Sequence, residues 1–130
     1  MKKELAVIIL NYNGATDTIA ALHSIIEYED LNLISVFVVD NNSTEEDFIK
    51  LKIAMINLGL IKKEIKDDFS DFISGNTFYL IRNSINYGFA KGNNRCICFA
   101  KNNGYSYFLL MNNDTELIEP SITKLLCAFK

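Results

Sequence analysis

Leu5-Ala6-Val7-Ile8-Ile9-Leu10, followed directly by Asn11-Tyr12-Asn13-Gly14, is the stretch that decides the fold. A short apolar run rich in Val and Ile that ends in turn-forming residues is typical of a buried strand. Helical patterns and further apolar runs alternate along the rest of the chain. This alternation predicts βαβ units and a mainly parallel sheet with helices on both faces, and therefore an α/β fold.

The remaining elements follow from the same alternation. Strands are predicted over 34–39, 77–81 and 105–111, and helices over 17–28, from 43 to about 58, over 90–101 and from about 120 onward. Thr16 is the expected N-cap of the first helix, and Ser43 and Glu46 have the spacing of a capping box for the second. Residues 60–76 are charged and irregular, so we interpret them as a surface insertion without an assigned function.

The composition is that of one globular domain spanning 1–130, with 49% hydrophobic residues. A net charge of −3 leaves no basic stripe for a phosphate polymer, which excludes nucleic acid as a partner. Nothing approaches the ~18 apolar residues of a membrane helix. Cys96, Cys98 and Cys127 lack a second Cys or His pair at metal-ligand spacing, so we interpret them as buried core thiols of a reduced, cytoplasmic protein.

Polar residues follow each of the four predicted strands; each of these loops contains two Asn residues, and in two of the loops they are adjacent. In an open parallel sheet, ligands bind beyond the carboxyl ends of the strands, where the strand order reverses. If the order is 3-2-1-4, Asn11-Tyr12-Asn13 and Asn112-Asn113-Asp114 flank that crevice, and Asp40 lies beside it. Asn and Asp also favour turns in general, but four such loops on one edge indicate a binding site.

Individual residues in these loops suggest separate roles. Asp40 could accept hydrogen bonds from a pyrimidine or a ribose hydroxyl, and its alternative role near a helix start is already supplied by Ser43. Gly88 and Gly92 stand four residues apart at a helix start, where backbone can approach a phosphate or a sugar closely. Asp114 is suited to a hard cation such as Mg²⁺, with an Asx-turn as the equally supported alternative.

Four segments together resemble the family 2 inverting glycosyltransferases of the GT-A fold, in particular their rhamnosyltransferase-like bacterial members. These segments are 7–14, 38–44, 86–94 and 109–115, and the match covers nearly the whole chain. The resemblance implies a Rossmann-like GT-A nucleotide-diphospho-sugar transferase fold. It also implies a UDP- or dTDP-sugar as donor, with Mg²⁺ or Mn²⁺ bridging the diphosphate.

The same resemblance assigns site residues. The base and ribose are expected at the ends of the first two strands, and residues 86–94 are expected to line the cleft for the sugar nucleotide. The metal is expected at the end of the fourth strand, where Asn112 and Asp114 occupy the ends of the family's Asp-X-Asp motif. The implied residues are Asn11, Tyr12, Asn13, Asp40, Asn42, Asn86, Gly88, Lys91, Asn94 and Asn113 for the sugar nucleotide, and Asp114 and Asn112 for the metal.

The chain also departs from the family pattern. Asn112 replaces an Asp, which should weaken metal binding without nucleotide, and Cys96 stands where relatives often carry Gly. Family catalytic domains are longer than this chain, and their acceptor site and catalytic base come from the later half. No catalytic residue is therefore assigned.

The expected function is donor binding within an enzyme that transfers sugar to a saccharide or lipid-linked acceptor, in the cytoplasm or at the inner face of the membrane. We expect an incomplete sheet to expose apolar edges and to favour self-association. Two alternatives remain open: a non-catalytic nucleotide-sugar-binding module or truncated inactive gene product, and a plain doubly wound domain whose Asn residues only form turns.

Overall fold

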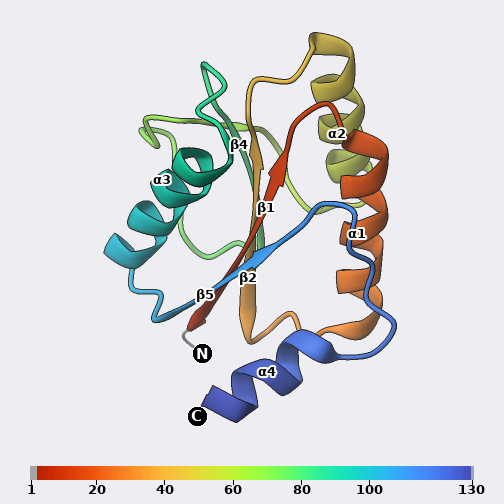
Figure 1. Cartoon of the computed structure of the whole chain (residues 1–130), viewed down its shortest axis with the longest axis vertical. Coiled ribbons are helices and arrows are strands. Elements are labelled where there is room, and N and C mark those ends of the chain that lie inside the picture. Colours follow the sequence, from red (N-terminus) through yellow and green to blue (C-terminus); the bar gives the residue numbers. More distant parts are fainter. Residues whose placement is uncertain (1–2, 130) are drawn as a thin grey trace.

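The computed structural model describes residues 3–129, which form a five-stranded parallel sheet with helices on both faces (Figure 1). The strand order is β3-β4-β2-β1-β5, and all neighbouring strands are parallel. Apart from the added edge strand β3, this is the predicted order. The strands are β1 (Leu5–Asn11), β2 (Ile34–Asp40), β3 (Ile65–Lys66), β4 (Phe78–Arg82) and β5 (Tyr107–Met111), and the helices are α1 (Ala15–Tyr28), α2 (Glu45–Asn57), α3 (Phe89–Asn102) and α4 (Ser121–Phe129).

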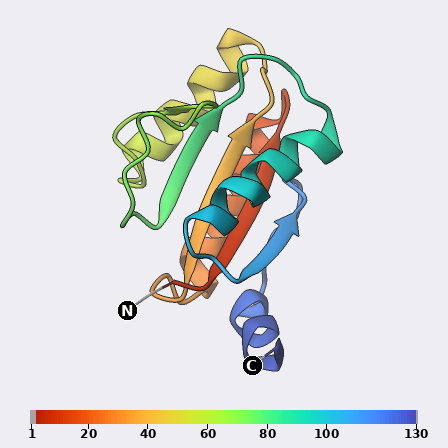
Figure 2. The ribbon, with the colours of Figure 1, turned by 90° about the vertical axis from the view of Figure 1, so that its left-hand side faces the viewer.

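Two apolar layers, one on each face of the sheet, hold the helices in place. Side chains alternate along a strand, so Val7 and Ile9 of β1 pack with α1 and α2, whereas Ala6 and Ile8 pack with α3. Figure 2 shows α3 crossing one face of the sheet, with α1 and α2 behind it. β1 and β2 are buried along nearly their whole length because both of their faces are covered.

Residues 60–76 are irregular and lie largely at the surface, as the sequence predicted, except for the two-residue strand β3 and a few anchoring side chains. Ile65 lies in β3, which pairs with β4, and is only 6% exposed. Phe69 stacks on Phe99 of α3 with ring centroids 3.8 Å apart, and Phe72 meets the same ring edge-on. The insertion extends the sheet and is anchored by apolar side chains. The spacing of these apolar side chains follows neither the period of a helix nor that of a strand, so the sequence pattern did not predict the anchoring.

The first helix begins directly after Gly14, which makes no side-chain cap, so the predicted cap Thr16 is wrong. Asn113 donates to the Gly14 carbonyl at 3.3 Å. A Cβ on residue 14 would lie only 2.5 Å from the Asn113 amide nitrogen. The absence of a side chain at this position therefore lets the loop after β5 close over the start of α1.

The second helix is capped one residue later than predicted. Thr44 is the N-cap, and its hydroxyl accepts a hydrogen bond from the Asp47 backbone N–H at 3.3 Å. The Ser43 hydroxyl instead donates to Asp40 at 2.7 Å. The predicted Ser43–Glu46 capping box does not form because the Ser43 side chain faces the strand end rather than the helix.

The segment between β5 and α4 is tied along α1. The Leu117 backbone N–H donates to the Ser24 hydroxyl at 2.9 Å. The Glu29 carboxylate accepts two backbone N–H groups at the start of α4, at 3.1 and 2.8 Å. A buried carboxylate at the N-terminus of a helix satisfies its unpaired donors and complements its dipole. Together with Asn113, these bonds fix the course of residues 112–120.

Strand β5 forms one edge of the sheet, and apolar side chains are exposed near it, including Leu110, Leu125 and Phe129. Self-association through this edge stays a prediction.

Within residues 3–129, no helix combines the length and the apolar character that crossing a membrane requires.

The three cysteines differ in environment. Cys96 lies on the buried side of α3, as expected for a core thiol. Cys98 and Cys127 are exposed, so the core interpretation is wrong for those two. Burial raises the pKa of the Cys96 thiol well above its usual value because the charged thiolate is disfavoured away from water.

We predict that iodoacetamide modifies two thiols of the native protein and the third only after unfolding, because the thiolate is the reactive form and Cys96 is neither ionised nor accessible. Mass spectrometry of tryptic peptides identifies the modified residues. A Cys98→Ser and Cys127→Ser double variant serves as the control and should react only in denaturant. Rapid labelling of Cys96 in the native double variant would contradict the packing of α3 described above.

Candidate functional site

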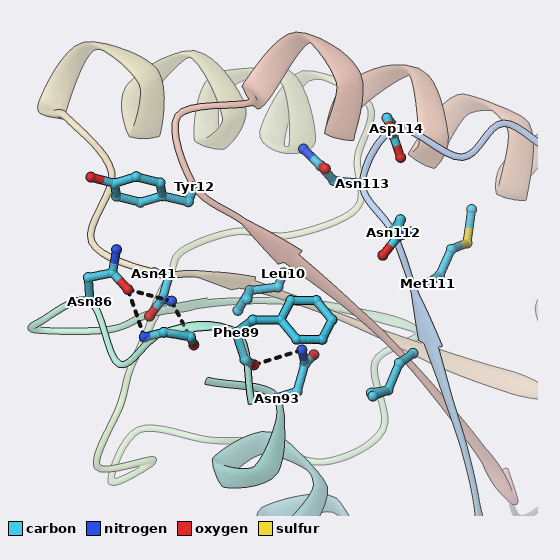
Figure 3. Close-up of a pocket in the computed structure, with 12 residues that line it drawn as sticks. Leu10, Tyr12, Asn41, Asn86, Phe89, Asn93, Met111, Asn112, Asn113 and Asp114 are labelled. Carbon is cyan, nitrogen blue, oxygen red and sulfur yellow. Dashed lines mark hydrogen bonds between the residues drawn. The ribbon is translucent and has the colours of Figure 1, made fainter. Parts of the chain in front are cut away.

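A pocket of ≈ 480 Å³ opens at the carboxyl end of the sheet, between the ends of β1 and β5 and the start of α3 (Figure 3). It lies where the chain order reverses: β1 leads to β2 on one side, whereas β4 leads through α3 to β5 on the other. This is the switch point at which open α/β sheets bind ligands. The lining residues are Leu10, Tyr12, Asn41, Asn86, Gly88, Phe89, Asn93, Leu110, Met111, Asn112, Asn113 and Asp114.

The pocket brings together half of the residues predicted for the site. Tyr12, Asn86, Gly88, Asn112, Asn113 and Asp114 line it, whereas Asn11, Asn13, Asp40, Asn42, Lys91 and Asn94 do not. Sequence reasoning missed Asn41, Phe89 and Asn93 as lining residues. Asn41 lies inside the quoted 38–44 segment, and its place directly after a buried strand was the available signal.

Asn11 and Asp40 form a buried network instead of facing the pocket. Both side chains are fully buried. The Asn11 amide nitrogen donates to Asp40 Oδ1 at 2.9 Å and to Asp47 Oδ2 at 3.1 Å, and its oxygen accepts from the Thr18 hydroxyl at 2.7 Å. Asp40 also accepts from the Ser43 N–H and hydroxyl. These contacts join two strand ends and two helix starts.

Asn13 and Asn42 shape the same two loops from the solvent side. Asn13 has a φ of 51° and Asn42 a φ of 65°, the left-handed region that Asn tolerates better than most residues. The Asn13 backbone N–H donates to the Ser43 hydroxyl at 2.8 Å, and its side-chain oxygen accepts from the Thr44 N–H at 2.9 Å. The loop after β1 is thereby fastened to the loop after β2.

Asn41 holds the pocket wall formed by residues 83–88. It is 2% exposed, and its amide nitrogen donates to Asn86 Oδ1 at 2.9 Å and to the Gly88 carbonyl at 3.1 Å. Its oxygen accepts from Asn83 Nδ2 at 3.1 Å and from the Tyr87 N–H at 3.0 Å. An amide group is well suited to this position because it donates and accepts at once.

The start of α3 borders the pocket with unpaired backbone donors. Gly88 precedes the helix with a φ of 79°, and the helix has neither a side-chain cap nor an acidic residue in its first turn. Gly92 faces Leu10, where a Cβ would come within 3.1 Å of a methyl group, so glycine allows α3 to approach β1 closely. The first N–H groups of such a helix, with its dipole, favour an anion.

Two exposed aromatic rings lie on the pocket wall. Tyr12 is 54% and Phe89 is 63% exposed, and both side chains are seen beside the pocket in Figure 3. Large apolar faces that remain open to solvent in a polar pocket suit the stacking of a planar ligand.

The opposite wall carries the predicted metal residues. Asn112 and Asp114 are exposed and line the pocket. Asn113 also lines it, but its amide nitrogen donates to the Thr18 hydroxyl of α1 at 3.3 Å. Among residues 3–129, no group of three or more His, Cys, Asp or Glu side chains could hold a metal. One carboxylate and one amide oxygen fit a hard cation that takes its other ligands from water and a phosphate-bearing ligand.

Solved structures of similar shape are glycosyltransferases, although neither a known family nor a curated protein matches the sequence. The mannosyltransferase PcManGT from Pyrobaculum calidifontis, in complex with GDP-Man and Mn²⁺, matches 95% of this chain with a TM-score of 0.67 and 16% identity. TarS 1-349 from S. aureus matches 97% with a TM-score of 0.64 and 19% identity, as does its complex with UDP-GlcNAc.

These likenesses establish the fold, which is that of the GT-A glycosyltransferases, as the sequence predicted. The chain spans about a third of the length of these solved structures, with 31%, 32% and 30% of each covered.

We predict that Asn11→Ala lowers the free energy of unfolding by about 1–3 kcal/mol, because it leaves buried partners of Asn11 without a hydrogen bond. Urea denaturation measures the change. Asn94→Ala, an exposed asparagine on α3, is the matched control and should change stability by no more than about 0.5 kcal/mol. Equal stabilities of the two variants would contradict the structural role of the network.

Proposed function

We propose that this chain is the donor-binding part of a glycosyltransferase and that the pocket between β1, β5 and α3 holds a nucleoside diphosphate sugar. The observation that carries the proposal is the position of the pocket at the switch point of a GT-A fold, beside an uncapped helix start. Two neighbours of the same fold were solved with sugar nucleotides, GDP-Man in one and UDP-GlcNAc in the other.

The lining suits the separate parts of such a ligand. Tyr12 and Phe89 offer stacking faces for the base, and the buried Asn11–Asp40 network holds the Tyr12 loop in place. The first N–H groups of α3 favour the diphosphate, and the exposed Lys91 lies in the same first turn of the helix. Asn86 and Asn93 add amide groups at the wall for hydroxyl groups of ribose or sugar.

Asp114 and Asn112 would hold Mg²⁺ or Mn²⁺. Held there, such a cation would supply positive charge to stabilise the negative charge of a departing diphosphate. Because this donor set has only one carboxylate, further oxygen ligands would have to come from water and from the phosphate groups of the ligand. The solved neighbour PcManGT was in complex with Mn²⁺.

The finer assignment follows the sequence resemblance. We propose a family 2, rhamnosyltransferase-like protein that uses a UDP- or dTDP-sugar and a saccharide or lipid-linked acceptor, at a cytoplasmic site. No residue of this chain is assigned as the base that deprotonates the acceptor. Transfer requires an acceptor held in line with the anomeric carbon and a base to take its proton, so we assign donor binding to the pocket and no catalytic step.

We predict that UDP or dTDP binds to the pocket with a Kd of millimolar or below, and that Tyr12→Ala weakens binding by ~5- to 150-fold because one stacking face is worth ~1–3 kcal/mol. Isothermal titration calorimetry with UDP, dTDP and GDP measures the affinities. Tyr28→Ala removes a partly exposed tyrosine of α1 that does not line the pocket and should leave binding unchanged. If none of the three nucleotides binds, or if the two variants bind nucleotide with equal affinity, the proposal is wrong.

We also predict that metal and nucleotide bind synergistically, because one carboxylate is too little for tight metal binding by the protein alone. Mn²⁺ affinity should rise ~5- to 150-fold in the presence of the nucleotide, as for a coupling of ~1–3 kcal/mol. Asp114→Asn should abolish this increase, whereas Glu116→Gln, an exposed carboxylate two residues further on, should retain it. Electron paramagnetic resonance of free Mn²⁺ measures both affinities, and equal Mn²⁺ binding with and without nucleotide contradicts the metal assignment.

A further inference from the structure

A carboxylate of the 60–76 insertion reaches the loop that forms one wall of the pocket. Asp67 Oδ2 accepts the Ser84 backbone N–H at 3.0 Å, the Ser84 hydroxyl at 2.9 Å and the Tyr87 hydroxyl at 3.0 Å. The partners lie 17 and 20 residues further along the chain. Asp67 therefore connects the insertion to both ends of the 84–87 segment.

Arg95 of α3 completes this connection. Its guanidinium donates to the Asp67 carbonyl at 3.0 Å, and its central carbon lies 4.3 Å from the centre of the Tyr87 ring. The side chain of Asp67 is only 16% exposed, so its bonds are shielded from water. Insertion, pocket loop and helix α3 thus meet at one cluster made of Asp67, Tyr87 and Arg95.

The 83–88 loop has few other supports. Ser84, Ile85 and Asn86 are exposed, and apolar packing there is slight. On the sheet side, Asn41 holds the loop through Asn86, the Tyr87 N–H and the Gly88 carbonyl. On the opposite side, Asp67 holds it through Ser84 and Tyr87. The loop that carries Asn86 and Gly88 into the pocket is consequently held between these two side chains.

We propose that Asp67 is a positioning residue for the pocket: the insertion holds the 83–88 loop in its ligand-binding position, and occupation of the pocket in turn stabilises the insertion. The inference rests on the proposed nucleotide-sugar function of the pocket. The reciprocal effect follows from thermodynamic linkage: if the Asp67 contacts favour the loop position that binds ligand, ligand binding favours those contacts by the same free energy.

The protonation of Asp67 agrees with this geometry. Burial by itself raises the pKa of the carboxyl group. Hydrogen bonds from Ser84 and Tyr87, with the nearby Arg95 charge, lower it further than burial raises it, so the pKa lies below its usual value. Asp67 is therefore ionised at neutral pH and accepts hydrogen bonds from all three donors.

The decisive measurement is amide hydrogen exchange in Asp67→Asn without ligand. The Tyr87 and Gly88 amides donate to Asn41 and Asn86, not to Asp67. They should nonetheless exchange about tenfold faster in Asp67→Asn if Asp67 positions the loop, whereas a purely local role would alter only Ser84. Asp68→Asn is the matched control, because the side-chain bonds of this neighbouring, exposed carboxylate go to Ser70 within the insertion.

Nucleotide affinity provides the second readout. We expect Asp67→Asn to bind UDP or dTDP about tenfold more weakly than the unchanged protein, Asp68→Asn to bind equally well, and nucleotide to slow amide exchange within 65–72. Tyr87→Phe removes only the hydroxyl and tests the same link without altering the insertion. Its effect on nucleotide affinity should be smaller. In the Asp67→Asn and Tyr87→Phe double variant, affinity should fall by less than the product of the two single effects, because both changes remove the same hydrogen bond between Asp67 and Tyr87.

The outcomes separate this inference from the proposed function. If the unchanged protein binds no nucleotide, the proposed function fails, and the exchange of the Tyr87 and Gly88 amides alone decides whether Asp67 positions the loop. If nucleotide binds but Asp67→Asn matches Asp68→Asn in affinity, or the Tyr87 and Gly88 amides keep their protection, the inference is overturned. Weaker binding together with faster exchange of these amides supports it.

Discussion

The hydrogen bond between Asn11 and Asp40 is the constraint on which the rest of the site depends. These residues are register partners at the ends of the two central strands, and both are fully buried. A buried carboxylate is tolerated only when its oxygens are hydrogen-bonded, so the loops after β1 and β2 must close on each other. That closure sets the starts of α1 and α2 and leaves the crevice on the β5 side of β1 open.

Asparagine side chains have two roles in this protein: some connect segments of the fold, and others lie on the pocket wall. Asn11, Asn41 and Asn113 each join segments that are distant in the chain, and Asn11 and Asn41 donate and accept at the same time without a net charge. Asn86 and Asn112 lie exposed on the pocket wall, where the same chemistry is available to a ligand. The amide groups therefore contribute hydrogen bonds to the site without adding charge of their own.

The α/β class and the polar edge of the sheet at which the pocket opens were predictable, because hydrophobic periodicity and polar strand ends carry them directly. The strand order was an assumption of the sequence analysis, since periodicity does not determine which strands are neighbours. Spacing does not say which way a strand-end side chain points, so Asn11 and Asp40 were predicted as ligand contacts although they face inward. Asn41 was overlooked because its role depends on Asn83 and Asn86, which adjoin it only after folding. The anchors of the insertion, Phe69 and Phe72, likewise have partners on α3 that no local pattern reveals.

The course of residues 112–120 along α1 has a consequence for the order in which the molecule assembles. The bonds that fix it, to Gly14 and Ser24 from this segment and to Glu29 from the start of α4, join residues 93 to 99 positions apart. Closing such long loops costs conformational entropy that is recovered only once β5 has docked on β1. We therefore expect the β1-α1-β2 unit to become structured early. The wall that carries Asn112 and Asp114 forms late, after the framework against which it is placed.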